Sequence, residues 1–387
     1  MTPDNVLIAA AERLQSDSAL RLMALAELEF YLILDRANDR FSGRAQRSYQ
    51  QSEPYLHGRA VVDEMLRIIG KITGAVKYAH SEVGYIDKIE SNDRELDGRR
   101  VEQHEIEFDL MPIEDLGCWL PVSRWLIRVI ADRCGASVTF LPKLDEGMAG
   151  SGLHLHLAIE KQGTNLVEQG DGGLSEPALR LIGGLLERAR SLSGFGNTVA
   201  ASYLRLVPGQ EAPTRVCWGR RNRLSLIRVP LSFRTNARVD LAMNPGEQSP
   251  ALEDLSRPTI EYRGPDGSAF THLLLAAVTA CVAEGLVSAS ALQTARELEV
   301  AADFAGDAAR LTALPELPTT AVAAAELLRR DRGFYEAGGI PARLIDIVIG
   351  KLEQEADAGL SARLRGLPAA ERLAKSRQLM HKDLHKH

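Results

Sequence analysis

Residues Gly150–Ile159 read GSGLHLHLAI, and this stretch alternates between leucines and histidines. Because successive side chains of a β-strand point to opposite faces, the three leucines share one face, and His154 and His156 share the other. An edge strand with its imidazoles in water would show the same alternation. The alternative is a metal or phosphate site, with the glycines allowing the backbone to approach a ligand closely. The rest of the chain decides between these interpretations.

Three other predicted strands carry polar pairs two residues apart in otherwise apolar sequence. A single pair of this kind usually belongs to a solvated face, but four pairs beside buried runs predict a shared polar cavity. Buried carboxylates raise each other's pKa unless a cation holds them together. Carboxylates with an imidazole, without a usable thiol pattern, favour Mg²⁺ or Mn²⁺ over structural zinc. The further pairs are Glu27 and Glu29, Glu105 and Glu107, and Glu261 and Arg263.

Arginines form a second cluster, in the segment SYLRLVPGQEAPTRVCWGRRNRLSLIRVP (202–230). The planar guanidinium group forms paired hydrogen bonds with phosphate and carboxylate oxygens. Arg220 and Arg221 fit a solvated basic face equally well, whereas Arg228 lies within the apolar run LSLIRVP. Divalent metals beside arginines are components that phosphoryl-transfer sites reuse. The other arginines of the segment are Arg205, Arg215 and Arg223.

The composition is that of an ordinary globular protein. The chain has 387 residues, of which 45% are hydrophobic and 25% charged, and its formal net charge of −6 argues against nucleic acid as a partner. The four cysteines form no CxxC motif, which is typical of a reducing cytoplasm. The N-terminus does not resemble a signal peptide, and Glu284 interrupts the apolar run 271–289. We therefore expect a cytoplasmic protein without a membrane span.

The order of the predicted elements indicates an α+β fold, with helices packed behind the strands that carry the polar pairs. The charged segment 87–100 is interpreted as a solvated loop or insertion, and the tail HKDLHKH (381–387) as frayed. Strands are expected over 23–34, 101–110, 136–142 and the start of 258–268. Helices are expected over 4–15, 58–79, 120–135, 176–195 and most of the chain after residue 271.

Seven ordered motifs between about Ala26 and Leu286 resemble those of the glutamine synthetase catalytic domain. The resemblance implies the α+β fold of that family, in which a curved antiparallel sheet with packed helices surrounds a bifunnel. The motifs are ELEFYL, AHSEVG, EQHEIEF, GSGLHLHL, SYLRLVPGQEAP, GRRNRLSLIRVP and IEYRGPD.

The resemblance implies two divalent metal ions per site, Mg²⁺ or Mn²⁺, and ATP as co-substrate. Positions that match the ligands of one metal are Glu29, Glu82 and Glu105, and those that match the other are Glu27, His154 and Glu261. Positions that match contacts of the ATP phosphates and the transferring phosphoryl group are His156, Arg223, Arg228 and Arg263. Positions that match the substrate site are Arg205, Gly150 and Arg263. The family's catalytic positions correspond to Arg223, Arg263 and the flap glutamate Glu211. Glu107 matches no position with an assigned role and is interpreted as a barrel or surface carboxylate.

Several features depart from the family pattern. Only 26 residues precede Glu27, where the family carries a β-grasp domain that covers the neighbouring subunit's site. A separate small β-grasp protein is therefore a candidate partner. Glu102 replaces the glycine of the G-Q-x-E motif, and Ala149 replaces an asparagine that touches the substrate. Insertions are expected at 87–100 and 231–258.

The implied activity is that of an ATP-dependent carboxylate–amine ligase, of the glutamine synthetase or γ-glutamyl-amide synthetase type. It would act through an acyl phosphate on glutamate or an analogue, and a homo-oligomer is expected. Two alternatives stay open: a phosphotransferase that stops at the phosphorylated carboxylate or guanidino group, and a non-catalytic nucleotide-binding paralogue with a regulatory role. Intact ligand positions argue against the paralogue, because buried carboxylates cost stability without a metal. The catalytic domain is expected over 1–290, with 291–387 as its helical extension.

Overall fold

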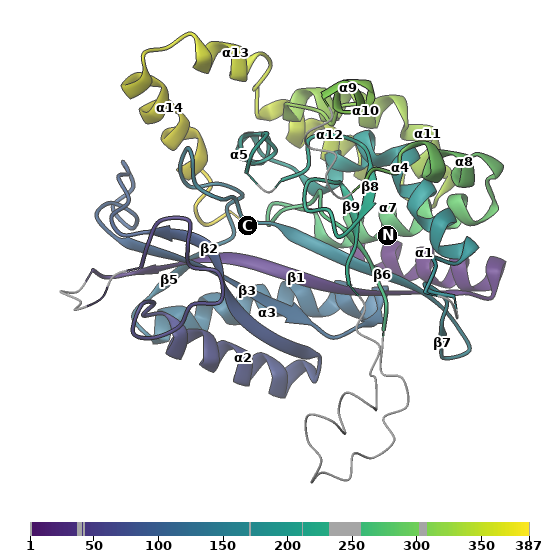
Figure 1. The fold of residues 1–387 in the computed structure, drawn as a ribbon, viewed down its shortest axis with the longest axis horizontal. Coiled ribbons are helices and arrows are strands. Elements are labelled where there is room, and N and C mark those ends of the chain that lie inside the picture. Colours follow the sequence, from purple (N-terminus) through teal and green to yellow (C-terminus); the bar gives the residue numbers. More distant parts are fainter. Residues whose placement is uncertain are drawn as a thin grey trace.

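The structure is a computed structural model that describes residues 2–36, 41, 43–169, 172–210, 212–231, 257–301 and 308–386. One large sheet runs through the molecule, with helices packed along it (Figure 1). The strands are β1 (Arg21–Leu34), β2 (Val76–Ile86), β3 (Arg100–Phe108), β4 (Met111–Pro112), β5 (Ser137–Thr139), β6 (Leu153–Lys161), β7 (Thr164–Asn165), β8 (Trp218–Arg220), β9 (Ile227–Val229) and β10 (Ile260–Tyr262).

The helices fall into an early group and a group that follows the last strand. The early helices are α1 (Pro3–Ser18), α2 (Arg59–Thr73), α3 (Ile113–Arg133), α4 (Glu176–Gly196) and α5 (Ala200–Arg205). The later helices are α7 (Thr271–Val287), α8 (Ala289–Glu297), α9 (Ala308–Ala313), α10 (Ala321–Arg330), α11 (Arg332–Ala337), α12 (Ala342–Gln354), α13 (Leu360–Arg365) and α14 (Ala369–His381).

The sheet confirms the expected α+β fold and brings the polar pairs together. Its order is β2-β3-β1-β6-β10-β9-β8, and every pair is antiparallel except β8 with β9. Strand β1 lies between β3 and β6, so that Glu29 is opposite Glu105, and Glu27 is opposite both Glu107 and His154. Side chains directly opposite each other on neighbouring strands are in contact range. The register therefore gathers four acidic side chains and one histidine at the centre of the sheet.

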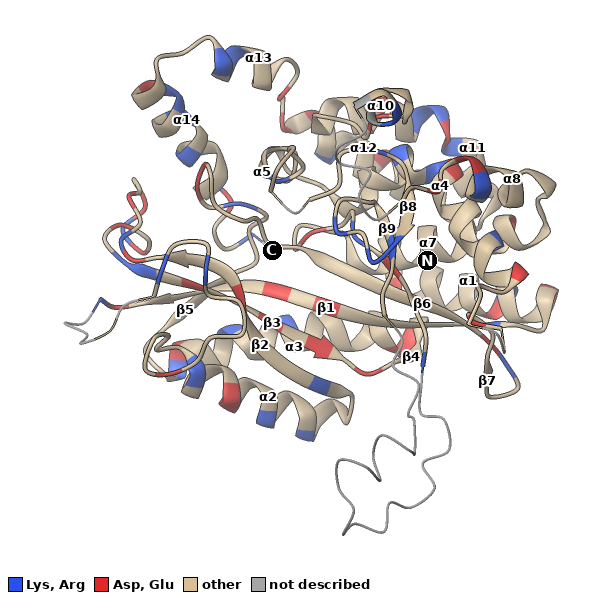
Figure 2. Ribbon diagram, in the orientation of Figure 1, with Lys and Arg blue, Asp and Glu red and all other residues tan. Residues whose placement is uncertain are grey.

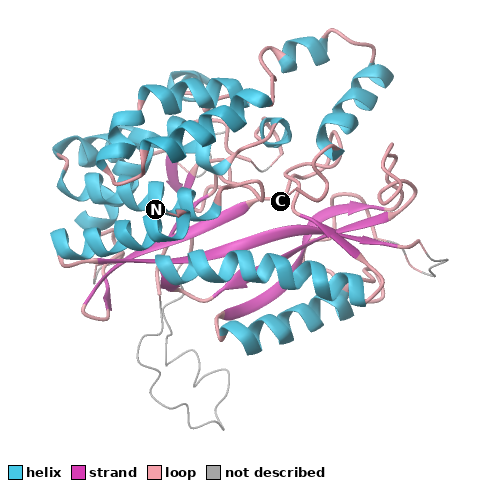
Figure 3. Ribbon diagram, turned by 180° about the vertical axis from the view of Figure 1, so that it is seen from behind, coloured by secondary structure: helices cyan, strands magenta, loops and turns pink. Residues whose placement is uncertain are grey.

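The two faces of β1 have different surroundings. Ala26, Leu28 and Phe30 are fully buried in the main core on one face. The alternate residues Glu27 and Glu29 point to the other face, as the period of two requires. Helices α2 and α3 pack against each other and against β2 and β1 respectively, and Figure 3 shows them side by side along the sheet. The apolar face is thereby covered, and the acidic face remains for the site.

Helix α7 is almost entirely buried, as expected for the apolar run 271–289. It packs against α1, α3 and α4. Among the residues that the structure describes, no single helix is long and apolar enough to cross a membrane, although the bent pair of α7 and α8 passes by length and composition.

The prediction of a helix over 58–79 is wrong at its C-terminal end. Helix α2 ends at Thr73, and Gly74 follows in the left-handed conformation with φ of 63°. A glycine at this position is a frequent helix stop, because it lacks the Cβ that disfavours positive φ. The chain then continues as β2, which pairs with β3. This strand was therefore missed, and with it His80, whereas Glu82 was expected from the AHSEVG motif.

The segment 87–100 and the C-terminal tail are packed together, which corrects two further expectations. Ile89 and Leu96 are completely buried in a second core cluster, which also contains Leu384 of the tail. Ser91 Oγ lies 2.9 Å from His381 Nδ1. The tail is therefore held by contacts rather than frayed, and the charged segment is a docked loop rather than a solvated one. Thr139 holds the tail further by donating a hydrogen bond to the carbonyl of Leu384.

Candidate active site

The acidic face of β1 lies at the bottom of a cavity of about 190 Å³. Figure 2 shows acidic segments in the middle of β1 and basic segments around β8 and β9. The predicted site residues that line this cavity are Glu27, Glu29, Glu82, Glu105, Gly150, His154, Arg205, Arg223, Arg228 and Arg263. Residues that the sequence analysis did not assign also line it, among them Tyr49, Tyr78, His80, Gln103 and Gln210.

A second cavity, of about 410 Å³, is lined by Glu27, Tyr78 and Arg228 as well. It also contains His156, with Lys77 and Arg257 around it. Because the same three residues line both cavities, the site has two ends that meet at Glu27. The first end carries Glu29, Glu82 and Glu105 beside several arginines. The second carries His156 and Arg257 beside Glu107 and Glu168.

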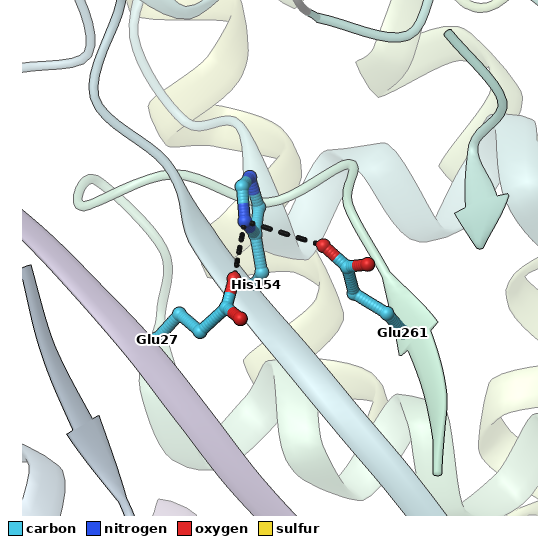
Figure 4. A group of neighbouring side chains, drawn as sticks. All are labelled: Glu27, His154 and Glu261. Atoms are coloured by element: carbon cyan, nitrogen blue, oxygen red, sulfur yellow. Dashed lines mark hydrogen bonds and ion pairs between the residues drawn. The ribbon is translucent and has the colours of Figure 1, made fainter. Parts of the chain in front are cut away.

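Three neighbouring strands supply the first candidate metal group, Glu27, His154 and Glu261. One ligand atom of each residue lies within 4.8 Å of the others. His154 Nδ1 is 2.9 Å from Glu27 Oε2 and 3.5 Å from Glu261 Oε1, so the imidazole lies between two carboxylates (Figure 4). Oxygen and imidazole donors in this arrangement fit a divalent cation. These are the three residues expected for one metal.

The second expected set is divided between two overlapping groups. Glu29 and Glu105 lie with His154, whereas Glu82 and Glu105 lie with His80. Glu82 comes from an irregular part of β2, where the five residues from Ser81 to Tyr85 oppose the three residues from Glu102 to His104 of β3. Such bulges redirect side chains at functional sites. Glu105 belongs to both groups and is the residue that joins them.

His80 is the main residue that the sequence analysis missed. It pairs across the sheet with Glu105, and its Nε2 atom is 3.0 Å from Glu105 Oε1. Its ring stacks on Tyr78 and meets the edge of Tyr49. His80 and Glu82 form a further polar pair two residues apart. The signal was present, but the segment was assigned in part to a helix.

Burial and neighbouring charge give the carboxylates different pKa values. Burial and the negative charges of Glu27, Glu82 and Glu29 raise the pKa of Glu105 well above its usual range. Burial also acts to raise the pKa of Glu27, but the charge of His156 and hydrogen bonds from His154 and His156 outweigh it and hold that pKa well below normal. The raised pKa of Glu105 shows an excess of negative charge in this cluster, and a bound cation would neutralise that charge.

Glu261 is completely buried between two arginines. It is hydrogen-bonded to Arg228, and its Oε1 atom accepts a hydrogen bond of 2.7 Å from Arg263 Nη1. Although burial acts to raise the pKa of Glu261, the charge of Arg263 lowers it. Glu261 therefore stays ionised beside His154 and aligns both guanidinium groups at the wall of the cavity.

His156 lies at the second end of the site. Its Nε2 atom is 2.9 Å from Glu27 Oε1, and its Nδ1 atom is 2.8 Å from Thr259 Oγ1. Burial lowers the pKa of His156, but the charge and hydrogen bond of Glu27 outweigh it and raise that pKa. His156 and His154 both lie inside the molecule, 6 and 7% exposed, which excludes the solvated edge strand.

The residues expected at the substrate site lie around Gly150. The guanidinium of Arg205, which is 3% exposed, donates hydrogen bonds to the carbonyls of Gly264 and Arg263. A Cβ atom at Gly150 would lie 2.6 Å from Arg205 Cγ, so only glycine fits here. Gln103 donates hydrogen bonds to Glu29 Oε2, at 2.8 Å, and to the carbonyl of Gly150, at 3.0 Å. Gln103 therefore connects the carboxylate of Glu29 to the backbone at Gly150.

The remaining predicted residues have varied surroundings. Arg223 is exposed at the cavity and lies over the ring of Tyr49, whereas Arg220 and Arg221 are exposed outside it. Glu107 is 4% exposed and pairs with Lys77 Nζ at 2.6 Å, so the surface interpretation is wrong. Glu211 and most of the insertion 231–258 lie outside the described residues.

Glu102, which replaces the motif glycine, has a structural role. It is completely buried, and its two oxygens accept hydrogen bonds of 2.9 Å from the backbone N–H groups of His57 and Gly58. These groups lie at the start of α2, where unpaired N–H groups need acceptors. The substitution thus fixes α2 against β3.

Comparison with known proteins agrees with this geometry. The family model described as "Glutamine synthetase, catalytic domain" matches residues 1–345. The chain belongs to the glutamine synthetase family. It is 38% identical over 184 residues to glutamine synthetase of Pyrococcus horikoshii, which covers 48% of this chain and 37% of the relative. It is 34% identical over 245 residues to glutamine synthetase of Thermococcus kodakarensis, which covers 63% of this chain and 50% of the relative. The chain thus spans half or less of the length of these glutamine synthetases.

Solved structures show the same fold. A structure titled "GmaS/ADP complex-Conformation 1" superposes with a TM-score of 0.68 at 20% identity and covers 96% of this chain and 76% of the other. Glutamine synthetase of Plasmodium falciparum superposes with a TM-score of 0.69 at 18% identity and covers 95% of this chain and 78% of the other. At these identities the likeness establishes the fold. The family predicted from the seven motifs is confirmed by the family model.

Proposed function

We propose that this chain is the catalytic part of an ATP-dependent ligase that joins a carboxylate to an amine through an acyl phosphate. The observation that carries the proposal is the position of the metal-binding groups. All of these groups except Glu261 line one cavity, together with Arg205, Arg223, Arg228 and Arg263. Glu27 and Arg228 also line the neighbouring cavity that contains His156. Family membership supports this reaction class.

The donor set fits two divalent ions. Glu27, His154 and Glu261 would hold one ion, and Glu29, Glu82 and Glu105 the other, with His80 beside them. Buried carboxylates, one of them with a raised pKa, are the ligands that Mg²⁺ or Mn²⁺ would neutralise. When bound, such ions neutralise the phosphate oxygens of ATP during phosphoryl transfer.

In this proposal, one group of residues binds ATP and another binds the substrate carboxylate. His156, Arg223 and Arg228 bind the phosphates of ATP and stabilise charge on the transferred group. Arg205, Gly150 and Arg263 bind and orient the substrate carboxylate. Its oxygen attacks the γ-phosphorus, and ADP leaves.

The amine nitrogen then attacks the acyl carbon, phosphate leaves, and the nitrogen loses a proton. Glu211 accepts that proton in this proposal. Ala149 offers no side-chain amide to the substrate, and its carbonyl is already bonded to Tyr31 Oη at 2.9 Å. We therefore propose glutamate or an analogue as the carboxylate and test a range of amines.

The test measures phosphate release with Mg²⁺ or Mn²⁺, ATP, glutamate or analogues, and a panel containing ammonia and primary amines. The expected result is release that depends on both carboxylate and amine. With hydroxylamine, an acyl phosphate gives a hydroxamate, which reports the intermediate directly. A stable phosphorylated product without amine dependence would indicate the phosphotransferase. Binding of ATP and Mn²⁺ in calorimetry without phosphate release for any carboxylate and amine would indicate the non-catalytic nucleotide-binding paralogue.

We also propose that a second protein surface completes the site, from another copy of the chain or from a small β-grasp protein. Four aromatic side chains are 41 to 49% exposed. Tyr49 and Tyr78 line the first cavity and contact His80, and the other two contact each other. Exposed aromatic groups of this kind are typical of interfaces. Light scattering of the chain, alone and with a β-grasp candidate, would test this, and an unchanged monomer would contradict it. The four residues are Phe41, Tyr49, Tyr55 and Tyr78.

A further inference from the structure

A third cavity, of about 460 Å³, lies apart from the active site, between α3, the end of α12 and the segment before α7. Its walls include Arg124 and Arg128 of α3, Lys351 of α12 and the side chain of Phe270. None of its lining residues lines either active-site cavity. Its volume is within the usual range for small-molecule sites.

Positive charge exceeds negative charge in this cavity, which is lined by Arg124, Arg128, Lys351 and Lys386 against the single carboxylate Glu355. The guanidinium groups of Arg124 and Arg128 both lie over the ring of Phe140, at 4.8 and 4.7 Å from its centre. In the described part of the chain, no carboxylate lies within 4.0 Å of either arginine or of Lys351. Two adjacent arginines of this kind repel each other unless an anion lies between them.

Burial makes this arrangement costly. Arg124 is 9% exposed, and burial with the charge of Arg128 lowers its pKa to about 10. Burial also lowers the pKa of Arg128. The carboxylate of the cavity, Glu355, is already engaged by Lys382 at 2.6 Å and by the backbone N–H of Ala200 at 2.9 Å. Arg124 has a carbonyl partner in Gly267 and the opposing charge of Asp266 nearby, but neither arginine has a carboxylate within 4.0 Å in the described chain, although buried charges are ordinarily paired.

We propose that this cavity is a binding site for a small oxyanion, a phosphate or carboxylate group of a metabolite. Arg124 and Arg128 provide the planar donors that pair with such oxygens, and Lys351 provides a third charge at the rim. Ser268 and Thr198 are hydroxyl residues of the same wall. Apolar contacts from Phe270 and Pro121 give room for a short organic chain attached to the anion.

The short segment from Gly264 to Gly267 connects the third cavity to the active site. Arg124 donates a hydrogen bond to the carbonyl of Gly267. Three residues earlier, the carbonyl of Gly264 accepts a hydrogen bond from Arg205 at 3.0 Å. Asn197 donates to both Gly264, at 3.0 Å, and Asp266, at 2.8 Å, and so holds the segment between them. An anion that engages Arg124 therefore acts on the segment that orients Arg205.

Calorimetric titration of the full chain in EDTA, with inorganic phosphate, pyrophosphate or succinate as separate probes, tests the proposal. We expect saturable binding of at least one probe, and the preferred probe assigns the phosphate or carboxylate class. Arg128→Gln and Lys351→Gln each remove one charged contact from partly buried or exposed positions, so the fold is retained. Each should weaken binding by about tenfold. Circular dichroism and melting temperature confirm folding of the variants.

Two controls separate this site from others. Arg133→Gln removes an exposed charge from the same helix and should leave binding unchanged. Arg228→Gln alters the active site and should also leave it unchanged. Absence of saturable binding by every probe would overturn the proposal. So would binding that survives Arg128→Gln but is lost in Arg228→Gln, because the anion would then occupy the active site. Because no turnover is measured, failure here is distinct from failure of the proposed ligase activity.

Discussion

Replacing Glu105 with glutamine should stabilise the metal-free protein and remove most of its response to divalent metal. The substitution keeps the size of the side chain and deletes one negative charge from a position that is 4% exposed. A ligand atom of Glu105 lies within 4.8 Å of one of Glu29. At an effective dielectric constant of about 20, two like charges at that separation repel by about 3 kcal/mol. Because a raised pKa lets Glu105 keep a proton part of the time, we expect a net gain of about 2 kcal/mol.

The pH dependence has a definite sign. The pKa of Glu105 is raised in the folded state, so its protonated form is favoured there. Its stabilising contribution is fully present below the unfolded-state pKa and is lost as pH rises through the folded-state pKa. Glutamine does not titrate. The difference between variant and wild type should therefore vanish near about pH 4.5 and grow toward neutral pH.

The assay is thermal unfolding at pH 7.5, in EDTA and in Mn²⁺. With an unfolding entropy of about 2.1 cal/mol/K per residue, about 2 kcal/mol corresponds to a rise in Tm of about 2–3 °C for a chain of this length. Wild type should gain about 3 kcal/mol at a metal concentration of about 100 times Kd. Glu12→Gln, an exposed control on α1, should change neither value. A lower Tm for Glu105→Gln in EDTA, or a metal response equal to wild type, would refute the reasoning.

Three further substitutions address other parts of the site. Glu261→Gln leaves Arg228 and Arg263 without their shared carboxylate and should cost about 3–5 kcal/mol in unfolding experiments, against at most about 1 kcal/mol for the exposed ion-pair residue Glu316→Gln. Equal losses would contradict the role of burial. Arg205→Gln should raise the KM for the carboxylate by at least about tenfold while ATP binding is retained, and a change confined to ATP binding would argue against its assignment. Glu102→Gln weakens two backbone hydrogen bonds at α2 and should cost about 1–3 kcal/mol in chemical denaturation, and an unchanged midpoint would exclude this structural role.

The sequence predicted the candidate site more completely than the local structure around it. The pairs at Glu27 and His154 were recognisable because a strand places alternate residues on one face. The pair of His80 and Glu82 has the same spacing, but its strand directly follows an amphipathic helix. Only the stop at Gly74 separates the two elements. A single glycine is a weak signal, and so the first residues of β2, 76–79, were predicted as helix.

Other outcomes depended on partners far away in the sequence. The segment 87–100 is charged, yet Ile89 and Leu96 are buried because the C-terminal tail packs over them. Glu107 is buried because Lys77 of the neighbouring strand neutralises it. Neither contact has a local signature. The sequence therefore predicted a solvated loop or insertion for the segment, and a barrel or surface carboxylate for Glu107.

The sequence by itself determined which residue types could perform the chemistry and which of them share a face, because the period of a strand is a local property of the backbone. The tertiary structure decided which carboxylates meet. Strand register places Glu29 opposite Glu105, and the bulge in β2 directs Glu82 toward them. It also decided which carboxyl group keeps its proton, because pKa values follow burial and neighbouring charge. The tertiary structure also brings the two arginines over Phe140 into the cavity between α3, α12 and the segment before α7. An excess of positive charge can be recognised only when the surrounding residues are known.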